Sequence, residues 1–211
     1  TFEQYLYDSY FVTAYSDSLY AEIQVEDSEL DGWYDENAEM YETYGILKSD
    51  QPDINVRHIL IAPDETAEDA TEEEQQAAKD AARAEAERIL KEWQDGEATE
   101  DSFGELANTY STDGGSNTNG GLYENIYHGQ MVQEFNDFCF GGHQPGDTAI
   151  VYGESSAYAG YHVVYFVEEG DLYSNYIAKS ALQSEAMSDW TNELNDACTV
   201  TEGFGFRFVG K

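Results

Sequence analysis

Two histidines, each at the start of an apolar run, bracket the middle of the chain and constrain its fold more than any other feature. His58 precedes Ile-Leu-Ile, and His162 precedes Val-Val-Tyr-Phe. Runs of this kind, which alternate or stay apolar, are typical of β-strands. We therefore expect two strands that close against each other and bring both imidazoles into one core.

Composition limits what such a chain can bind. The 211 residues suit one large domain or two small ones, and 41% of them are hydrophobic. The formal net charge of -35 opposes compaction, but 17 Tyr and 10 Phe are too many for a disordered chain. A folded protein with a strongly acidic surface repels phosphate backbones. We therefore expect no nucleic-acid partner and a preference for basic or neutral clients.

The cysteines and the lengths of the apolar runs argue against a zinc-binding protein and against a membrane-spanning helix. Cys139 and Cys198 are interpreted as two unpaired small hydrophobic residues, with a disulfide as an alternative that no spacing rule supports. The sequence has no zinc-binding pattern, and no run approaches the ~18 apolar residues of a membrane-spanning helix.

Hydrophobic periodicity predicts helices at both ends of the chain and an α+β unit between them. A linker is expected over residues 46–53 and a polar, glycine-rich loop over 112–121. The expected helices are 2–24, one that begins at Asp27 or Ser28, 71–94, 103–110, 130–140 and 173–197, and the expected strands are 54–62, 150–151, 161–167 and 203–208.

The terminal helices carry apolar faces that have no other large partner in the sequence. We therefore expect residues 2–45 and 173–208 to pack together although they are far apart along the chain. The residues that define the two faces are Tyr10, Leu19 and Trp33 on one side and Ile177, Met187 and Trp190 on the other.

Between and around the two histidines, short motifs follow in a fixed order. They are His-Ile-Leu-Ile over 58–61, Phe-x-x-Leu-Ala-x-x-Tyr-Ser-x-Asp over 103–113, Gly-Gly-Leu over 120–122, Gly-Gln-Met-Val-x-x-Phe over 129–135, Pro-Gly-Asp over 145–147 and Gly-Tyr-His-Val-Val over 160–164. This set resembles the parvulin-type peptidyl-prolyl isomerases over a little more than half of the chain. The flanking helices look like the split chaperone domain of extracytoplasmic foldases of the PrsA and SurA type.

The resemblance implies a fold and a division into domains. The fold is an α+β, FKBP-like antiparallel sheet with surrounding helices, inserted between helical chaperone segments. The implied boundaries are 1–53 for the N-terminal chaperone segment, 54–169 for the parvulin domain, and 170–211 for a helix and strand that complete the chaperone domain.

The resemblance also implies site residues. His58, Asp113 and His162 match the catalytic positions, and no metal or other cofactor is implied. The substrate-binding positions are matched by Gln130, Met131, Phe135 and one of Ile126 or Tyr127, of which Tyr127 is chosen. Some parvulins carry Cys at the loop position that Asp113 occupies here, so a carboxylate argues against obligatory covalent chemistry.

The sequence departs from the parvulin pattern in two places, one that affects the expected activity and one that affects the expected substrate. Ahead of His162, family members often carry hydroxyl residues that bond to the histidines; here those places hold Ala157 and Ala159, with Ser155, Ser156 or Tyr158 as substitutes. The basic loop of phospho-specific parvulins is replaced by the acidic stretch 64–69.

The implied function is prolyl isomerisation that assists the folding of secreted proteins and does not depend on phosphorylation. The implied partners are unfolded or partly folded polypeptides with X-Pro bonds. The implied location is extracytoplasmic, secreted or at the cell surface; a lipid anchor would belong to a longer precursor. The alternative is a client-binding chaperone whose parvulin domain is weak or inactive. A third hypothesis, a secreted structural or adhesive protein, rests on acidity alone.

Overall fold

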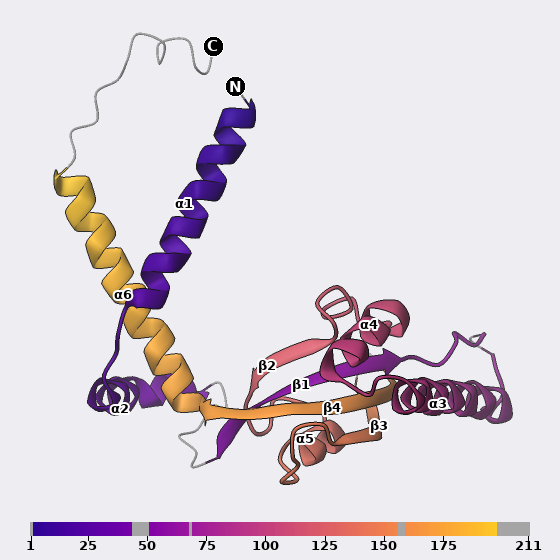
Figure 1. Ribbon diagram of the computed structural model, residues 1–211. Helices are drawn as coiled ribbons and strands as arrows, with labels where there is room; N and C mark the ends of the chain where they lie inside the picture. The colour runs from indigo at the N-terminus through magenta and orange to yellow at the C-terminus, as the bar shows by residue number, and fades with distance from the viewer. Residues whose placement is uncertain (1, 44–50, 68, 156–158, 198–211) are drawn as a thin grey trace. The chain divides into compact units, whose positions relative to one another are not determined.

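The structure is a computed structural model that describes residues 2–43, 51–67, 69–155 and 159–197 (Figure 1). The chain forms two compact units. One is Lys48–Tyr173, and the other joins Thr1–Leu47 to Ser174–Lys211. The predicted strand at 203–208, together with Cys198 and Ala157, lies outside the described residues.

A four-stranded sheet in the order β2-β1-β4-β3 forms the middle of the Lys48–Tyr173 unit. Its strands are β1 (Pro52–Ile61), β2 (Leu122–Ile126), β3 (Thr148–Glu154) and β4 (Ala159–Leu172), and every neighbouring pair is antiparallel. The predicted α+β class with an antiparallel sheet is therefore confirmed. β1 starts two residues before the predicted position.

The edge strand β2 was not predicted from the sequence. Its five residues, Leu-Tyr-Glu-Asn-Ile, show no clean alternation, and Asn125 takes a positive φ of 55°. Pairing with β1 makes this segment a strand, because hydrogen bonds from a partner outweigh weak local preference.

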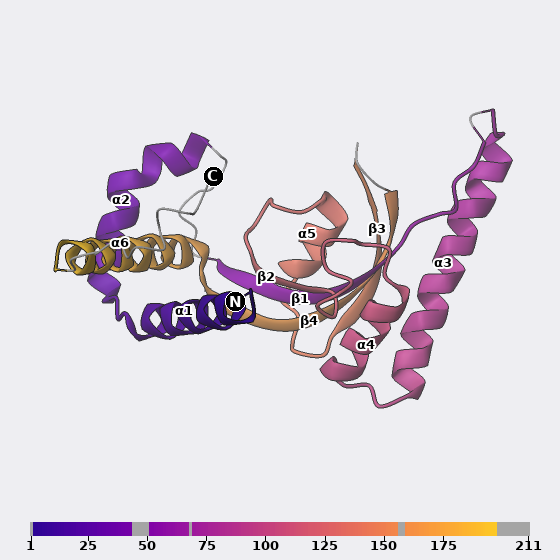
Figure 2. The ribbon, with the colours of Figure 1, turned by 90° about the horizontal axis from the view of Figure 1, so that it is seen from above.

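Helices cover both faces of the sheet (Figure 2). α3 (Glu72–Asp95) and α4 (Glu100–Tyr110) each begin at a threonine that forms a capping box with the residue three positions on. α5 (Gln133–Cys139) lies on the other face. It is shorter than the predicted helix 130–140, and Val132 at its start makes no side-chain cap hydrogen bond.

The two faces bury two separate apolar clusters. The cluster under α3 and α4 contains Ile59, Ile61, Ala82, Ala86, Ile89, Trp93, Phe103, Ala107, Val163 and Tyr165. The cluster under α5 contains Ile54, Val56, Ile126, Phe135, Phe138, Cys139, Val164 and Phe166. Because neighbouring residues of a strand face opposite ways, His58 lies on the α5 face when Ile59 lies on the other.

The second unit contains α1 (Phe2–Glu22), α2 (Asp27–Thr43) and α6 (Tyr173–Ala197). The Tyr20 hydroxyl donates to the Ser180 carbonyl at 3.0 Å, and Gln183 Nε2 donates to the Ile23 carbonyl at 3.1 Å. Tyr10 and Trp190 are exposed, which differs from the shared face that the sequence pattern predicts.

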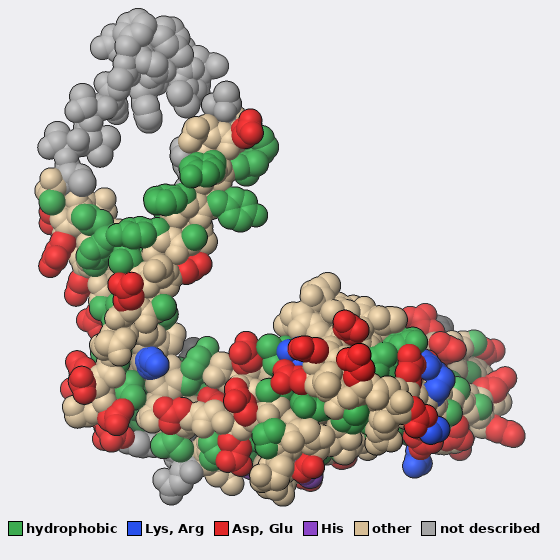
Figure 3. Space-filling view, in the orientation of Figure 1, with side chains coloured by type: hydrophobic (Ala, Val, Ile, Leu, Met, Phe, Trp, Pro, Cys, Tyr) green, Lys and Arg blue, Asp and Glu red, His purple; other side chains and the backbone are tan. Residues whose placement is uncertain are grey.

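The charged side chains on the face shown in Figure 3 are mostly acidic, and large apolar side chains gather along α1. Phe2, Tyr7, Tyr10 and Phe11 are each more than half exposed. Among the described helices, none combines the length and the apolar character that crossing a bilayer requires.

Asp53, in the second position of β1, is the most unusual buried group of the sheet. It is 2% exposed, and its Oδ1 has no hydrogen-bond partner within the described part of the chain. It also occupies the space where Gly170 would carry a Cβ. Burial first, and then repulsion from Asp171 and Glu168, raises its pKa from 3.8 to about 6.

Replacing Asp53 is expected to stabilise the fold at neutral pH. Because the folded pKa exceeds the unfolded one, the contribution of Asp53 to stability is full below pH 3.8 and is lost as the pH rises through 6. Asp53→Asn removes this loss, and urea unfolding should show a gain of about 3 kcal/mol at pH 8 and about half of that at pH 5. The exposed Asp80→Asn is the control; if both variants follow the wild-type curve, Asp53 does not titrate as described.

Candidate active site

The two histidines lie on neighbouring central strands, in the part of the sheet that α5 covers. In the β1–β4 ladder His58 is opposite Val164, and His162 is opposite Leu60. Their Nδ1 atoms are 3.0 Å apart, and the rings are nearly parallel with centroids 5.2 Å apart. The expected proximity of the two imidazoles is confirmed.

The loop after α4 is bonded to β1, and this contact places Asp113 beside His58. The Thr112 amide donates to the Leu60 carbonyl at 2.8 Å, and the Leu60 amide donates to Ser111 Oγ at 3.0 Å. His58 Nε2 then lies 3.0 Å from Asp113 Oδ2.

The Gly-Gly-Leu motif lies against β1 in a position that requires glycine. The His58 amide donates to the Gly121 carbonyl at 2.8 Å, and Gly121 has a φ of 70°. A Cβ at this position would collide with the His58 carbonyl. Only glycine lets this loop approach β1 so closely.

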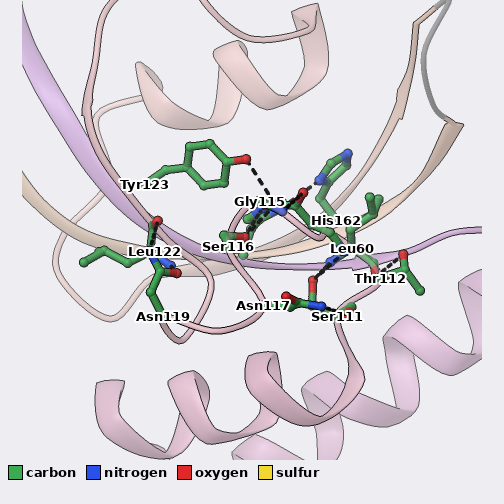
Figure 4. Close-up of polar contacts among 12 residues, drawn as sticks. Leu60, Ser111, Thr112, Gly115, Ser116, Asn117, Asn119, Leu122, Tyr123 and His162 are labelled. Carbon is green, nitrogen blue, oxygen red and sulfur yellow. Dashed lines mark hydrogen bonds and ion pairs between the residues drawn. The ribbon is translucent and has the colours of Figure 1, made fainter. Parts of the chain in front are cut away.

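Several donors hold the Asp113 carboxylate. Ser116 Oγ donates to Oδ2 at 2.6 Å and the Tyr123 hydroxyl donates to Oδ2 at 3.0 Å, while the Gly115 amide donates to Oδ1 at 3.1 Å. Figure 4 shows the Tyr123 hydroxyl directed towards the loop that carries Gly115 and Ser116.

Burial alone would raise the pKa of Asp113. Hydrogen bonds from Ser116, the Gly115 amide and His58 outweigh that effect and lower the pKa to about 2. Asp113 is therefore an anion at neutral pH. Because an anionic carboxylate only accepts hydrogen bonds, His58 Nε2 carries a proton.

The same hydrogen bonds fix the form of both histidines. Burial lowers the pKa of His58, and burial together with His58 lowers the pKa of His162 to about 3. Both rings are therefore neutral near pH 7. With Nε2 of His58 protonated, its Nδ1 is the acceptor, and the Nδ1 of His162 donates to it.

A cavity of about 240 Å³ opens beside this network. Phe135 is 3% exposed and meets both imidazoles edge-on, with centroid distances of 5.7 Å to His58 and 5.3 Å to His162. Phe135 is therefore a core residue as well as a wall of the cavity. The residues that line the cavity are His58, Leu60, Thr112, Asp113, Gly114, Tyr123, Met131, Phe135 and His162.

Two of the predicted substrate-binding residues do not line this cavity. Gln130 uses its side-chain oxygen to accept from the Tyr127 amide at 3.1 Å. The Tyr127 ring stacks on Tyr173 with a centroid distance of 4.5 Å. Ile126, the other residue considered for this role, is fully buried in the core under α5. The motif gives each of these residues a place in the sequence, but side-chain direction decides which ones face the cavity.

The sequence argument missed Thr112, Ser116 and Tyr123. Ser116 is the most informative, because its Oγ lies 3.1 Å from His58 Nε2 and supplies a hydroxyl to the histidine network. This hydroxyl comes from the glycine-rich loop. Before His162, Ala159 begins β4, and Ser156, Ala157 and Tyr158 lie outside the described residues. A serine within a loop of turn-forming residues gives no signal that would distinguish it beforehand.

Residues 2–43, 51–67, 69–155 and 159–197 hold no group of three or more His, Cys, Asp or Glu that could bind a metal ion.

A profile of the PPIC-type PPIase domain matches residues 39–169, which is more than half of the chain. The chain therefore belongs to the PPIC-type, or parvulin-type, family of peptidyl-prolyl isomerase domains.

Its sequence is similar to two foldases. It is 33% identical over 128 residues to the foldase protein PrsA of Caldanaerobacter subterraneus subsp. tengcongensis, covering 59% of this chain and 31% of that protein. It is 29% identical over 151 residues to the foldase protein PrsA 1 of Listeria monocytogenes serovar 1/2a, covering 67% of this chain and 42% of that protein. The chain thus spans less than half the length of these relatives.

Two solved structures resemble the chain more loosely. PrsA from Bacillus subtilis gives a TM-score of 0.43 at 19% identity, with 93% of this chain and 85% of that chain covered. The PrsA peptidylprolyl isomerase from Bacillus cereus gives 0.41 at 19% identity, with 100% and 93% covered.

NMR of the imidazole nitrogens can check the protonation pattern of the site. We expect both rings to be neutral near pH 7, with the proton on Nε2 of His58 and on Nδ1 of His162. Because burial lowers both folded pKa values below the ordinary value of 6.5, the stability that the neutral rings contribute is full above pH 6.5 and is lost as the pH falls, for His162 as it passes through about 3. A charged ring on either histidine at pH 7 would contradict the assignment.

Proposed function

We propose that this chain catalyses cis-trans isomerisation of X-Pro bonds in polypeptide clients. One observation carries the proposal. A single cavity combines apolar walls with the anionic carboxylate of Asp113, which is hydrogen-bonded to His58 of the buried histidine pair. Family membership supports the same reaction.

The chemistry requires no covalent intermediate. Rotation about the peptide bond is slow because its partial double-bond character creates a barrier of ~18–20 kcal/mol. The planar amide is charge-separated and the twisted amide is less so. An apolar cavity that removes water therefore favours the twisted form over the planar one.

The walls and the carboxylate have different tasks in this proposal. Leu60, Met131 and Phe135 surround the prolyl ring and exclude water. Asp113 lies near the carbonyl that precedes proline, where its negative charge opposes the build-up of negative charge on the oxygen of the planar form. His58 and His162 hold Asp113 in place.

The acidic surface and the relatives suggest what the clients are. The relatives are named foldases, so we propose unfolded or partly folded polypeptides as clients and an extracytoplasmic location. The net charge of -35 favours basic or neutral segments.

A second function, client holding by the helical unit, is favoured by one observation. The exposed Phe2, Tyr7, Tyr10 and Phe11 of α1 form an apolar surface larger than single scattered side chains. We propose that this unit is a chaperone segment that retains clients. A chain that only holds clients would show no turnover, and this separates the alternatives.

Turnover on unphosphorylated X-Pro peptides tests the proposal, and Asp113→Asn tests the role of the carboxylate. The variant should lower kcat about 10- to 100-fold and change KM less than about twofold, because its charge acts mainly as the amide twists. Exchange NMR of the peptide measures both values, and Asp80→Asn, exposed on α3, is the control. Absence of wild-type turnover on every peptide would leave only the chaperone function.

Phosphorylated peptides are expected to be poorer substrates than Glu-Pro peptides. Exposed Asp64, Glu65 and Asp69 follow β1, and Asp113 adds a charge in the cavity, so a dianionic phosphate is repelled more than one carboxylate. We expect kcat/KM to be several-fold lower for phospho-Ser-Pro than for Glu-Pro, and the ratio to approach one at 0.5–1 M salt. A preference for the phosphorylated peptide would refute this substrate assignment.

A further inference from the structure

Tyr123 is a residue of the cavity that the motifs do not explain. It follows Gly-Gly-Leu on the edge strand β2 and is opposite Val56 of β1. It is partly buried and lines the cavity. An apolar ring alone would be enough to line the cavity, so the hydroxyl of Tyr123 is expected to have a role of its own.

The hydroxyl has a defined partner at the centre of the site. It donates to Asp113 Oδ2 at 3.0 Å, and the Tyr123 ring meets the His58 ring nearly edge-on at 5.0 Å. The same side chain therefore touches both the carboxylate and the imidazole that holds it.

The three donors to Asp113 Oδ2 come from three parts of the fold. His58 approaches from β1 at 3.0 Å, Ser116 from the same loop as Asp113 at 2.6 Å, and Tyr123 from β2 at 3.0 Å. Ser116 belongs to the same loop as Asp113, so its hydrogen bond to Oδ2 does not by itself tie the carboxylate to a strand. Together, His58 and Tyr123 tie the carboxylate to two neighbouring strands.

The distribution of donors leaves the other carboxylate oxygen less occupied. Oδ1 accepts a hydrogen bond only from the Gly115 amide, at 3.1 Å, among the described residues. A carboxylate has about four lone-pair positions. Saturating Oδ2 therefore holds the carboxylate in one rotamer, with Oδ1 as the oxygen that can interact with a substrate.

We propose that Tyr123 is a positioning residue for isomerisation, which fixes the Asp113 carboxylate in one orientation through its hydroxyl. The inference rests on the proposed function. Its test must separate the hydroxyl from the ring, since the ring also forms a wall of the cavity.

Tyr123→Phe removes the hydroxyl and keeps the ring. One charge-assisted hydrogen bond supports an expected fall in kcat of about 10-fold, with KM changed less than about twofold. The matched control is Tyr152→Phe on β3. The Tyr152 hydroxyl also donates to a carboxylate, that of Glu154 at 2.9 Å, but Tyr152 does not line the cavity, and wild-type kinetics are expected.

A double-mutant cycle shows whether Tyr123 acts through Asp113. In an Asp113→Asn background, Tyr123→Phe should lower kcat less than about twofold, because the anionic acceptor of its hydrogen bond is already gone. An independent 10-fold loss in that background, or wild-type kcat in the single variant, would overturn the proposal.

NMR of the Asp113 carboxyl carbon supplies a measurement that does not depend on turnover. In Tyr123→Phe the titration midpoint of Asp113 should rise above its wild-type value, because one donor to the anion is lost. An unchanged midpoint would also overturn the proposal. If the wild type is inactive, the proposed function fails, and this titration still decides the role of the hydroxyl.

Discussion

The antiparallel pairing of β1 with β4 is the interaction on which the rest of the site depends. It joins His58 to His162 across 104 residues of sequence and places their Nδ1 atoms 3.0 Å apart. β1 also anchors the loop before Asp113 through Leu60, and it anchors the glycine pair through His58. A shift of β1 by one residue in this register would move His58 to the face that packs under α3 and α4 and so separate it from His162.

Charge is distributed unevenly across this small polar network. Asp113 is an anion that several donors stabilise, while the two buried imidazoles are neutral because burial disfavours their charged forms. The negative charge therefore stays at the edge of the cavity, next to apolar walls. In the isomerisation that we propose, such an arrangement would act on the electron distribution of a bound amide without proton transfer, since the reaction only rotates a bond.

The two units of the chain differ in how completely they bury their apolar side chains. The sheet unit buries two apolar clusters and forms a concave site between α5 and the loop after α4. In the helical unit, α1 leaves several large aromatic side chains exposed. Asp53, near the start of β1, shows that the sheet unit also tolerates a buried acid at a cost that grows as the pH rises.

The sequence by itself determined the α+β class, the central strands with their histidines and helix α3, and the resemblance of its motifs placed Asp113 in the loop after α4. The strands and the helix follow from local periodicity, and Asp113 follows from a motif of fixed spacing. Only the tertiary structure decided that Leu122–Ile126 is a strand, since its pairing with β1 outweighs weak local preference. The tertiary structure also turned Gln130 and Tyr127 away from the cavity and brought Ser116 and Tyr123 to Asp113. Spacing along a chain places a residue in a loop or on a strand, but the direction of a side chain depends on neighbours that are distant in sequence.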